Sequence, residues 1–209
     1  MKTLIFSALF SMLTFSISPA TGNQSVQVDN DMVSKWNQFV RDIYQLHLKQ
    51  TKDKNIDTSK RLGGYYRQPD FFKEIRFTDK NSDTLISRIE WETKQPDKIH
   101  SIEVRVHDNN NKIIREYSAS YLPDFRNAPY QTLINIHHYN DKIHSFRQYD
   151  ASANLLYEVC RSNDTNKKLF EHDDYEIPDN FKQGVGSQAD YKKCFQQLAL
   201  SSAQNKPPH

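Results

Sequence analysis

Between residues 74 and 161, apolar and polar positions alternate in a series of short runs. Side chains two residues apart lie on the same face of a strand, so this alternation is typical of antiparallel strands with one buried and one solvated face. Clusters of Asp, Asn, Gln and Pro separate the runs and indicate tight turns. The pattern predicts an antiparallel β-meander of six or seven strands. The runs are 74–78, 85–92, 102–107, 113–121, 132–139, 143–149 and 155–161.

Two segments that flank these runs have the period of a helix. The first starts at a capping residue among 29–31 and ends near Gln50, and the second covers residues 187–204, where Ser187 and Asp190 have the spacing of a capping box. Each carries one apolar stripe that has to be covered, so both helices are expected to pack on one face of the sheet in an α+β fold. The stripes are Val33, Trp36, Phe39, Val40, Ile43 and Leu46, and Tyr191, Cys194, Phe195 and Leu198.

The first 20 residues have the parts of an export signal. Lys2 provides a positive charge, residues 4–15 are mostly apolar, and Ser18 and Ala20 are small residues at the positions that a signal peptidase reads. The apolar run is shorter than the ~20 residues that a membrane-spanning helix needs, and no later segment is longer. The sequence therefore predicts a signal peptide at 1–20, a periplasmic or secreted chain, and no membrane span after cleavage.

The mature chain is predicted to be a single domain over residues 21–204. Within it, the charged segment 51–62 has no apolar period and is expected to be a mobile loop. The acidic segment 171–176 is expected to be a solvated loop, and the Pro-containing residues 205–209 a disordered tail.

Cys160 and Cys194 are the two cysteines of the chain. An even count in an exported protein predicts a disulfide, which would join the last helix to the sheet. The whole sequence has 28 Lys and Arg against 26 Asp and Glu, and the charges of both signs alternate along the strands. Nucleic-acid binding requires clustered Lys and Arg, so we expect no nucleic-acid partner, and we expect a monomer without a cofactor.

The string Asp-Lys-Ile-His-Ser occurs at residues 97–101 and again at 141–145. It opens two related hairpins and gives His100 and His144 equivalent positions. In each hairpin an Asp starts the turn, Asp108 or Asp150, and Asn111 or Ala153 follows three residues later. An Asp in this position accepts hydrogen bonds from backbone N–H groups two residues on, and Asn tolerates the left-handed conformation. The repeat therefore predicts two turns of the same kind.

The second of these hairpins, with its turn at residues 149–155, resembles the tyrosine-aspartate repeats of RHS-type secreted proteins. The first, with Asp108 and Asn111, resembles them less. In those proteins long arrays of such repeats build β-shells, and glycine is expected where Asn111 and Ala153 stand here. The resemblance implies β-hairpins.

Two sets of residues are candidates for binding. Gly63 and Gly64 precede a dense group of aromatic residues and one arginine, which is either a contact surface for a partner or glycan or part of the core. His100 and His144 could approach other histidines of the sheet, but the ligand spacings of known metal motifs are missing, so we expect a hydrogen-bonding role and no metal. The aromatic group contains Tyr65, Tyr66, Phe71 and Phe72 beside Arg67, and the other histidines are His107, His137 and His138.

The sequence contains none of the common signatures of a nucleophile elbow, a phosphate loop or a dinucleotide site, so we assign no catalytic residue. It favours an exported binding or envelope-accessory protein whose partner is a protein or glycan of the cell envelope. One alternative is a secreted hydrolase that uses carboxylates or histidines on the sheet. Another is a carrier of a small apolar ligand, with a pocket near Trp36, Phe39 and Trp91. A pocket with convergent carboxylates favours the hydrolase, an apolar pocket the carrier, and a filled sheet with an exposed aromatic rim the binding protein.

Overall fold

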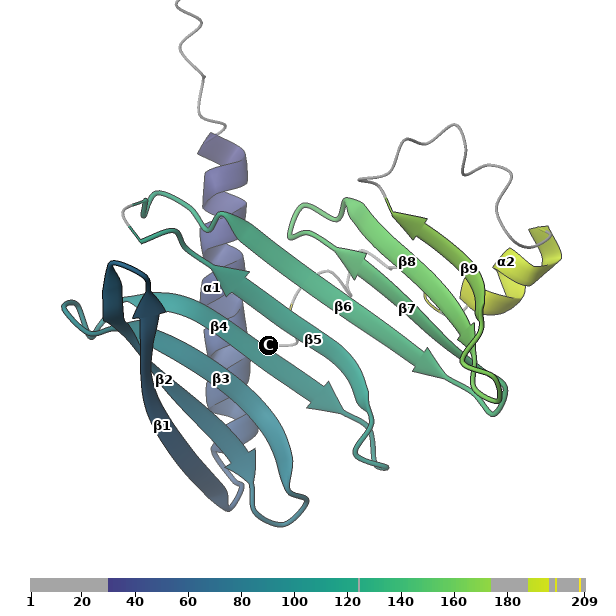
Figure 1. Ribbon diagram of the computed structural model, residues 1–209, viewed down its shortest axis with the longest axis horizontal. Helices are drawn as coiled ribbons and strands as arrows, with labels where there is room; N and C mark the ends of the chain where they lie inside the picture. Colours follow the sequence, from purple (N-terminus) through teal and green to yellow (C-terminus); the bar gives the residue numbers. More distant parts are fainter. Residues whose placement is uncertain (1–29, 124, 174–187, 196–197, 199–206, 208–209) are drawn as a thin grey trace, which may run out of the picture.

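Nine antiparallel strands form one sheet in the order of the chain (Figure 1). The computed structural model describes residues 30–123, 125–173, 188–195, 198 and 207. The antiparallel meander and the two helices agree with the sequence pattern, whereas the number of strands exceeds the expected six or seven. The elements are α1 (Asn30–Thr51), β1 (Ile56–Tyr65), β2 (Gln68–Asp79), β3 (Thr84–Glu92), β4 (Ile99–His107), β5 (Ile113–Ser120), β6 (Gln131–Tyr139), β7 (Ile143–Tyr149), β8 (Leu155–Ser162), β9 (Lys168–Asp173) and α2 (Gln188–Phe195).

The runs predicted from alternation are β2 to β8, and the two additional strands are the outermost ones. β1 occupies most of the segment 51–62 that we expected to be a loop, and β9 contains the start of the acidic segment. Almost every side chain of β1 is exposed, so the strand is held by backbone pairing with β2 and leaves no apolar period in the sequence. Its charged residues, among them Asp57, Lys60 and Arg61, protect an edge strand from pairing with other chains.

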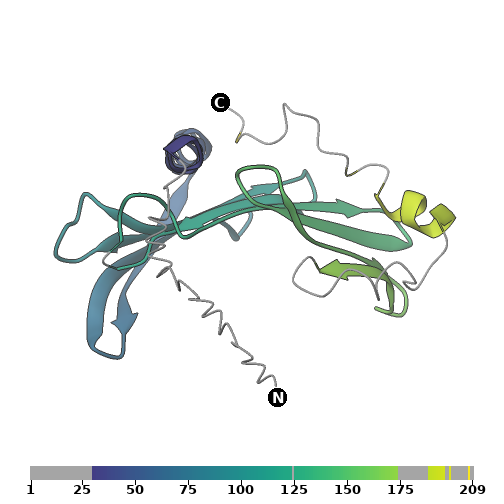
Figure 2. The same cartoon turned by 90° about the horizontal axis from the view of Figure 1, so that it is seen from above.

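The main core lies between α1 and the centre of the sheet. Figure 2 shows α1 end-on, on one side of the sheet, and its main contacts are with β3, β4 and β5. The predicted stripe is buried from Phe39 onward, and the Phe39 ring meets Tyr117 edge-on with the centroids 6.4 Å apart. Trp36 is only half-buried, and its indole N–H donates to Ser152 Oγ at 3.0 Å. The buried side chains of this core include Val40, Ile43, Leu46, Ile89, Ile102, Val104, Ala119 and Ile134.

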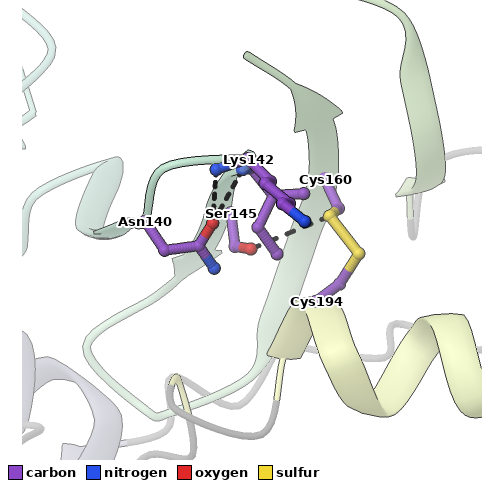
Figure 3. The surroundings of a disulfide bond; sticks show 6 residues. Asn140, Lys142, Ser145, Cys160 and Cys194 are labelled. Atoms are coloured by element: carbon purple, nitrogen blue, oxygen red, sulfur yellow. Dashed lines mark hydrogen bonds between the residues drawn. A yellow bond between two sulfur atoms is a disulfide. The ribbon is translucent and has the colours of Figure 1, made fainter. Parts of the chain in front are cut away.

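A disulfide joins Cys160 of β8 to Cys194 of α2, as the sequence predicts (Figure 3). The Cα atoms are 5.9 Å apart, and Ser145 Oγ donates to the Cys160 sulfur at 3.8 Å. The Arg147 guanidinium lies 4.7 Å from the centre of the Phe195 ring and thus connects α2 to β7 as well. The strand pairing puts Cys160 opposite Ser145, on the side of the sheet that faces α1.

Several expectations concern residues outside the described part of the chain. These are the signal peptide at 1–20, the capping residue Ser187, and most of the segment 196–209. Of that last segment, Leu198 and Pro207 are described, and both are buried.

The two turns of the repeat have the same geometry. Asp108 Oδ1 accepts from the backbone N–H groups of Asn110 and Lys112 at 2.8 and 2.9 Å. Asp150 Oδ1 likewise accepts from the residues two and four positions later, at 2.8 and 2.9 Å. Asn111 has a φ of 60° and Ala153 a φ of 70°, so both are left-handed. The repeated string therefore encodes two equivalent hairpin turns, as expected.

The left-handed conformation is costly for alanine and free for glycine. We expect Ala153→Gly to stabilise the protein by about 0.5 kcal/mol, because relief of strain exceeds the entropy that glycine adds to the unfolded chain. Ala151→Gly is the matched control, since Ala151 does not have a positive φ and the change should cost about 0.5–1 kcal/mol. Denaturant unfolding measures both. An Ala153→Gly variant as unstable as Ala151→Gly would contradict this turn geometry.

Truncation of the α1 stripe should be costly where the stripe is buried. We expect Phe39→Ala to lower the free energy of unfolding by roughly 3–5 kcal/mol, because it removes a buried ring from the main core. Trp36→Ala should lower the free energy of unfolding clearly less than Phe39→Ala does, since the indole is half-exposed. Thermal and urea unfolding of the two variants test this order, and a Phe39→Ala variant of wild-type stability would show that α1 is not packed as described.

A buried histidine makes this core sensitive to acid. The His47 ring packs 4.5 Å from the Phe77 ring, its Nδ1 lies 2.8 Å from Ser87 Oγ, and burial lowers its pKa from 6.5 to about 4. The unfolded chain therefore binds a proton at a pH where the folded chain does not, and stability falls as the pH drops from about 6.5 towards 4.

We expect this linkage to remove about 3 kcal/mol of stability over that range. His47→Gln does not titrate, so its free energy of unfolding should fall less between pH 7 and pH 4 than that of the wild type. Urea unfolding at a series of pH values measures the difference between the two slopes. Identical slopes would mean that His47 titrates alike in the folded and unfolded chain.

Candidate functional site

The residues predicted to form a contact surface occupy the turn between β1 and β2. Tyr65, Tyr66 and Arg67 are all exposed there, and Tyr66 is fully so. The glycine before them is required by packing, because a Cβ on Gly64 would overlap the carbonyl oxygen of Gln68. The sequence thus brings two tyrosines and a guanidinium onto a tight turn at one end of the sheet.

A buried histidine, His100, packs against the side chains of this turn. The His100 ring lies among Tyr65, Phe71 and Phe72, with centroids 5.8, 5.1 and 5.6 Å away. Burial raises the pKa of Tyr65 and lowers that of His100, and the Tyr65 hydroxyl shares a hydrogen bond with the His100 Nε2 at 2.6 Å. His100 was predicted as a contact residue, and the structure places it beneath the surface, where it positions Tyr65.

The loop between β5 and β6 lies at the same end of the sheet (Figure 1). Arg126 of this loop forms an ion pair with Glu92, donates to the carbonyl oxygen of Ile99 at 3.3 Å and lies 5.4 Å from the centre of the Tyr121 ring. Its charge also affects the pKa of Tyr65, so the loop and the β1–β2 turn are close together.

Three large apolar side chains of this loop are exposed: Leu122, Phe125 and Tyr130. Sequence reasoning treated the segment 123–129 only as a turn and missed them. The available signal was the gathering of aromatic residues in a Pro-containing loop too short to bury them. We call the exposed group the apical patch, which consists of Tyr65, Tyr66, Arg67, Leu122, Phe125 and Tyr130.

His144 lies elsewhere, although the repeat gives it the same position as His100. Because β4 and β7 run in opposite directions, the two histidines are at opposite ends of the sheet. His144 instead meets His137 of β6, with its Nε2 3.1 Å from the His137 Nδ1. Among the residues that the structure describes, no group of three or more His, Cys, Asp or Glu side chains is arranged to hold a metal ion.

The face of the sheet opposite α1 carries a row of paired charges and amides. Glu74 accepts from Arg61 and Arg76, both at 2.8 Å. Farther along, Glu103 accepts from Arg88 at 2.9 Å. The row extends to β7 and includes Arg61, Glu74, Arg76, Arg88, Glu103, Arg105, Glu116, Asn135 and Gln148, which we call the polar ribbon.

One carboxylate beside the ribbon has a different environment. Glu90 stands opposite Glu74 across the β2–β3 pair, and burial raises its pKa. Two neighbouring carboxyls whose environments push their pKa values apart are the arrangement used by glycosidases. Here, however, both oxygens of Glu74 are bonded to the Arg61 guanidinium, which restricts the carboxylate to a structural role.

A cavity of about 330 Å³ lies at the other end of the sheet, beside the end of α1 and the β2–β3 and β4–β5 turns. Its lining includes Lys54, Asp79, Arg105, His107 and Asp108. Asp79 accepts from the backbone N–H of Asn81 at 3.0 Å, which holds its pKa below the usual value, and Asp108 caps its own turn. The cavity is therefore polar, and its carboxylates are already engaged in turns.

Near the residues suggested for an apolar pocket, several described side chains pack against one another. Phe39 packs on Tyr117, and the Trp91 ring lies 6.0 Å from the Tyr44 ring in an edge-on contact. Of the features that the sequence analysis named as discriminating, the exposed aromatic rim, which favours a binding protein, is present.

Comparison with models of protein families, with characterised proteins and with solved structures gave no significant match to this chain. The resemblance of the hairpins to tyrosine-aspartate repeats therefore rests on their turn residues alone. Neither helix in the described ranges combines the length and apolar character that crossing a membrane requires.

Proposed function

We propose that this protein is an exported binding protein that contacts a protein or glycan of the cell envelope through the apical patch. The observation that carries the proposal is that several aromatic rings are exposed on a turn and a loop that buried side chains hold in place. Tyr65 is fixed by His100, and the neighbouring loop is fixed by Arg126 through Glu92. Loops on a rigid scaffold commonly carry binding residues, and Tyr, Phe and Arg supply large contact areas at interfaces.

The distribution of exposed apolar side chains supports this location. Of the eight large hydrophobic side chains that are exposed in the described ranges, five belong to the apical patch. Scattered exposed residues are normal, whereas a gathering of them marks an interaction surface. We propose further that both helices cover one face of the sheet and the polar ribbon keeps the other face solvated, which leaves the apical end for a partner.

Export is supported by two features. The first 20 residues have the composition of a signal peptide, and the Cys160–Cys194 disulfide is compatible with an oxidising compartment outside the cytosol. A bond between α2 and β8 would be reduced and lost in a cytosolic protein, so the architecture and the export signal support the same location.

The binding test uses Tyr66→Ala combined with Arg67→Ala. Because both side chains are exposed, we expect the variant to unfold within about 0.5 kcal/mol of the wild type. Capture of envelope components by the immobilised protein should fall at least tenfold, as expected for loss of more than 1.4 kcal/mol of binding free energy. Leu48→Ala is the matched control, since it removes an exposed apolar side chain from the opposite end of α1.

Equal capture by the wild type, the double variant and the Leu48→Ala variant would contradict the proposal. Loss of capture in the Leu48→Ala variant alone would indicate that the binding surface lies near the C-terminal end of α1 and not at the apical patch.

A further inference from the structure

A pair of histidines on the face of the sheet opposite α1 brings two ring nitrogens together. The rings of His137 and His144 are parallel and lie nearly edge to edge, with an interplanar angle of 5° and centroids 5.3 Å apart. Tyr139 stacks on His144 at 4.4 Å, and Phe146 contacts His137 at 4.9 Å. Both histidines belong to paired strands, β6 and β7, so their separation is fixed by the sheet.

The distance between the facing nitrogens suits one metal ion. His137 Nδ1 and His144 Nε2 are 3.1 Å apart. With this separation, an ion about 2.05 Å from each nitrogen would have a nitrogen–metal–nitrogen angle of about 98°. That angle lies between the values of about 90° and about 109° for square-planar and tetrahedral coordination. A rotation of the rings about χ2, a broad torsion in histidine, directs both lone pairs at the ion.

The protonation state also suits metal binding. Burial lowers the pKa of both histidines, that of His137 to about 4, so both rings are neutral near pH 7. In the metal-free pair one N–H lies between the facing nitrogens. On binding, that proton moves to the other nitrogen of the same ring, and both facing nitrogens then donate lone pairs with no net release of protons.

The surroundings select the class of ion. The charge of Arg161 acts on His144, and the Lys112 ammonium lies 5.2 Å from the centre of the Tyr139 ring. Two nitrogen ligands beside cationic side chains are unsuitable for Ca²⁺ or Mg²⁺, which require several oxygen ligands. Imidazole suits Cu²⁺ and Zn²⁺, and Cu²⁺ binds most tightly to a given set of nitrogen ligands.

We propose that His137 and His144 form a surface site for a divalent transition-metal ion, Cu²⁺ in preference to Zn²⁺, with water as the remaining ligands. This site is independent of the apical patch, which lies at the other end of the sheet. The repeated Asp-Lys-Ile-His-Ser string then supports two roles: its first histidine positions a tyrosine, and its second binds a metal.

The test is titration of the disulfide-bonded protein with Cu²⁺ and separately with Zn²⁺, followed by calorimetry. We expect one Cu²⁺ per chain at the tightest site and weaker binding of Zn²⁺. His144→Ala and His137→Ala should each weaken the binding of Cu²⁺ at least tenfold. His138→Ala is the matched control, because His138 neighbours His137 on the same strand but points to the opposite face, and it should bind as the wild type does.

A second measurement covers the case in which a variant fails to fold. In the wild type, paramagnetic Cu²⁺ should broaden the imidazole NMR signals of His137 and His144 first and those of His47 and His100 last. Broadening that starts elsewhere, or unchanged affinity in folded His144→Ala and His137→Ala, would overturn the proposal.

Discussion

Burial of the α1 stripe against the centre of the sheet is the interaction on which the rest of the structure depends. A meander of strands has two faces and can bury neither by itself, so it needs another layer. α1 provides this layer for β3, β4 and β5, where Phe39, Val40, Ile43 and Leu46 meet the apolar side chains of the sheet. The opposite face carries the polar ribbon, whose charges are paired between neighbouring strands.

One helix cannot cover nine strands, so the two edges of the sheet, at β1 and at β9, are stabilised in other ways. At the first edge, β1 relies on backbone pairing with β2 and on the Arg61–Glu74 ion pair. Near the β9 edge, the disulfide and the Arg147–Phe195 contact attach α2 to β8 and β7. At the β1 edge, the β1–β2 turn contributes Tyr65 and Tyr66 to the apical patch, and both tyrosines stay exposed.

Prediction from the sequence succeeded where burial imposes a period. β2 to β8 and α1 each have one face in a core, so apolar residues recur at the spacing of that element. β1 lies at the sheet edge with nearly all side chains exposed, and its strand conformation depends on β2, a tertiary contact that leaves no local pattern. β9 is short and likewise lies at an edge.

The candidate sites show the same division between local and long-range information. Tyr65, Tyr66 and Arg67 were predictable because two glycines and several aromatics lie together in the sequence. Their proximity to Phe125 and Tyr130 depends on the directions of the four intervening strands, β2 to β5. The repeat correctly matched the turns at Asp108 and Asp150, but strand direction separates His100 from His144 and gives the latter a different neighbour.

The most direct test of this account is amide hydrogen exchange of the disulfide-bonded protein, resolved to single elements. If α1 and the sheet centre form one cooperative core, the amides of residues 39–47 should exchange as slowly as those of β4 and β5, all through global unfolding. Amides of β1 should exchange faster, since they are protected by edge pairing alone. Exchange of α1 much faster than that of β4 and β5 would show that the helix is not docked, and would contradict the account.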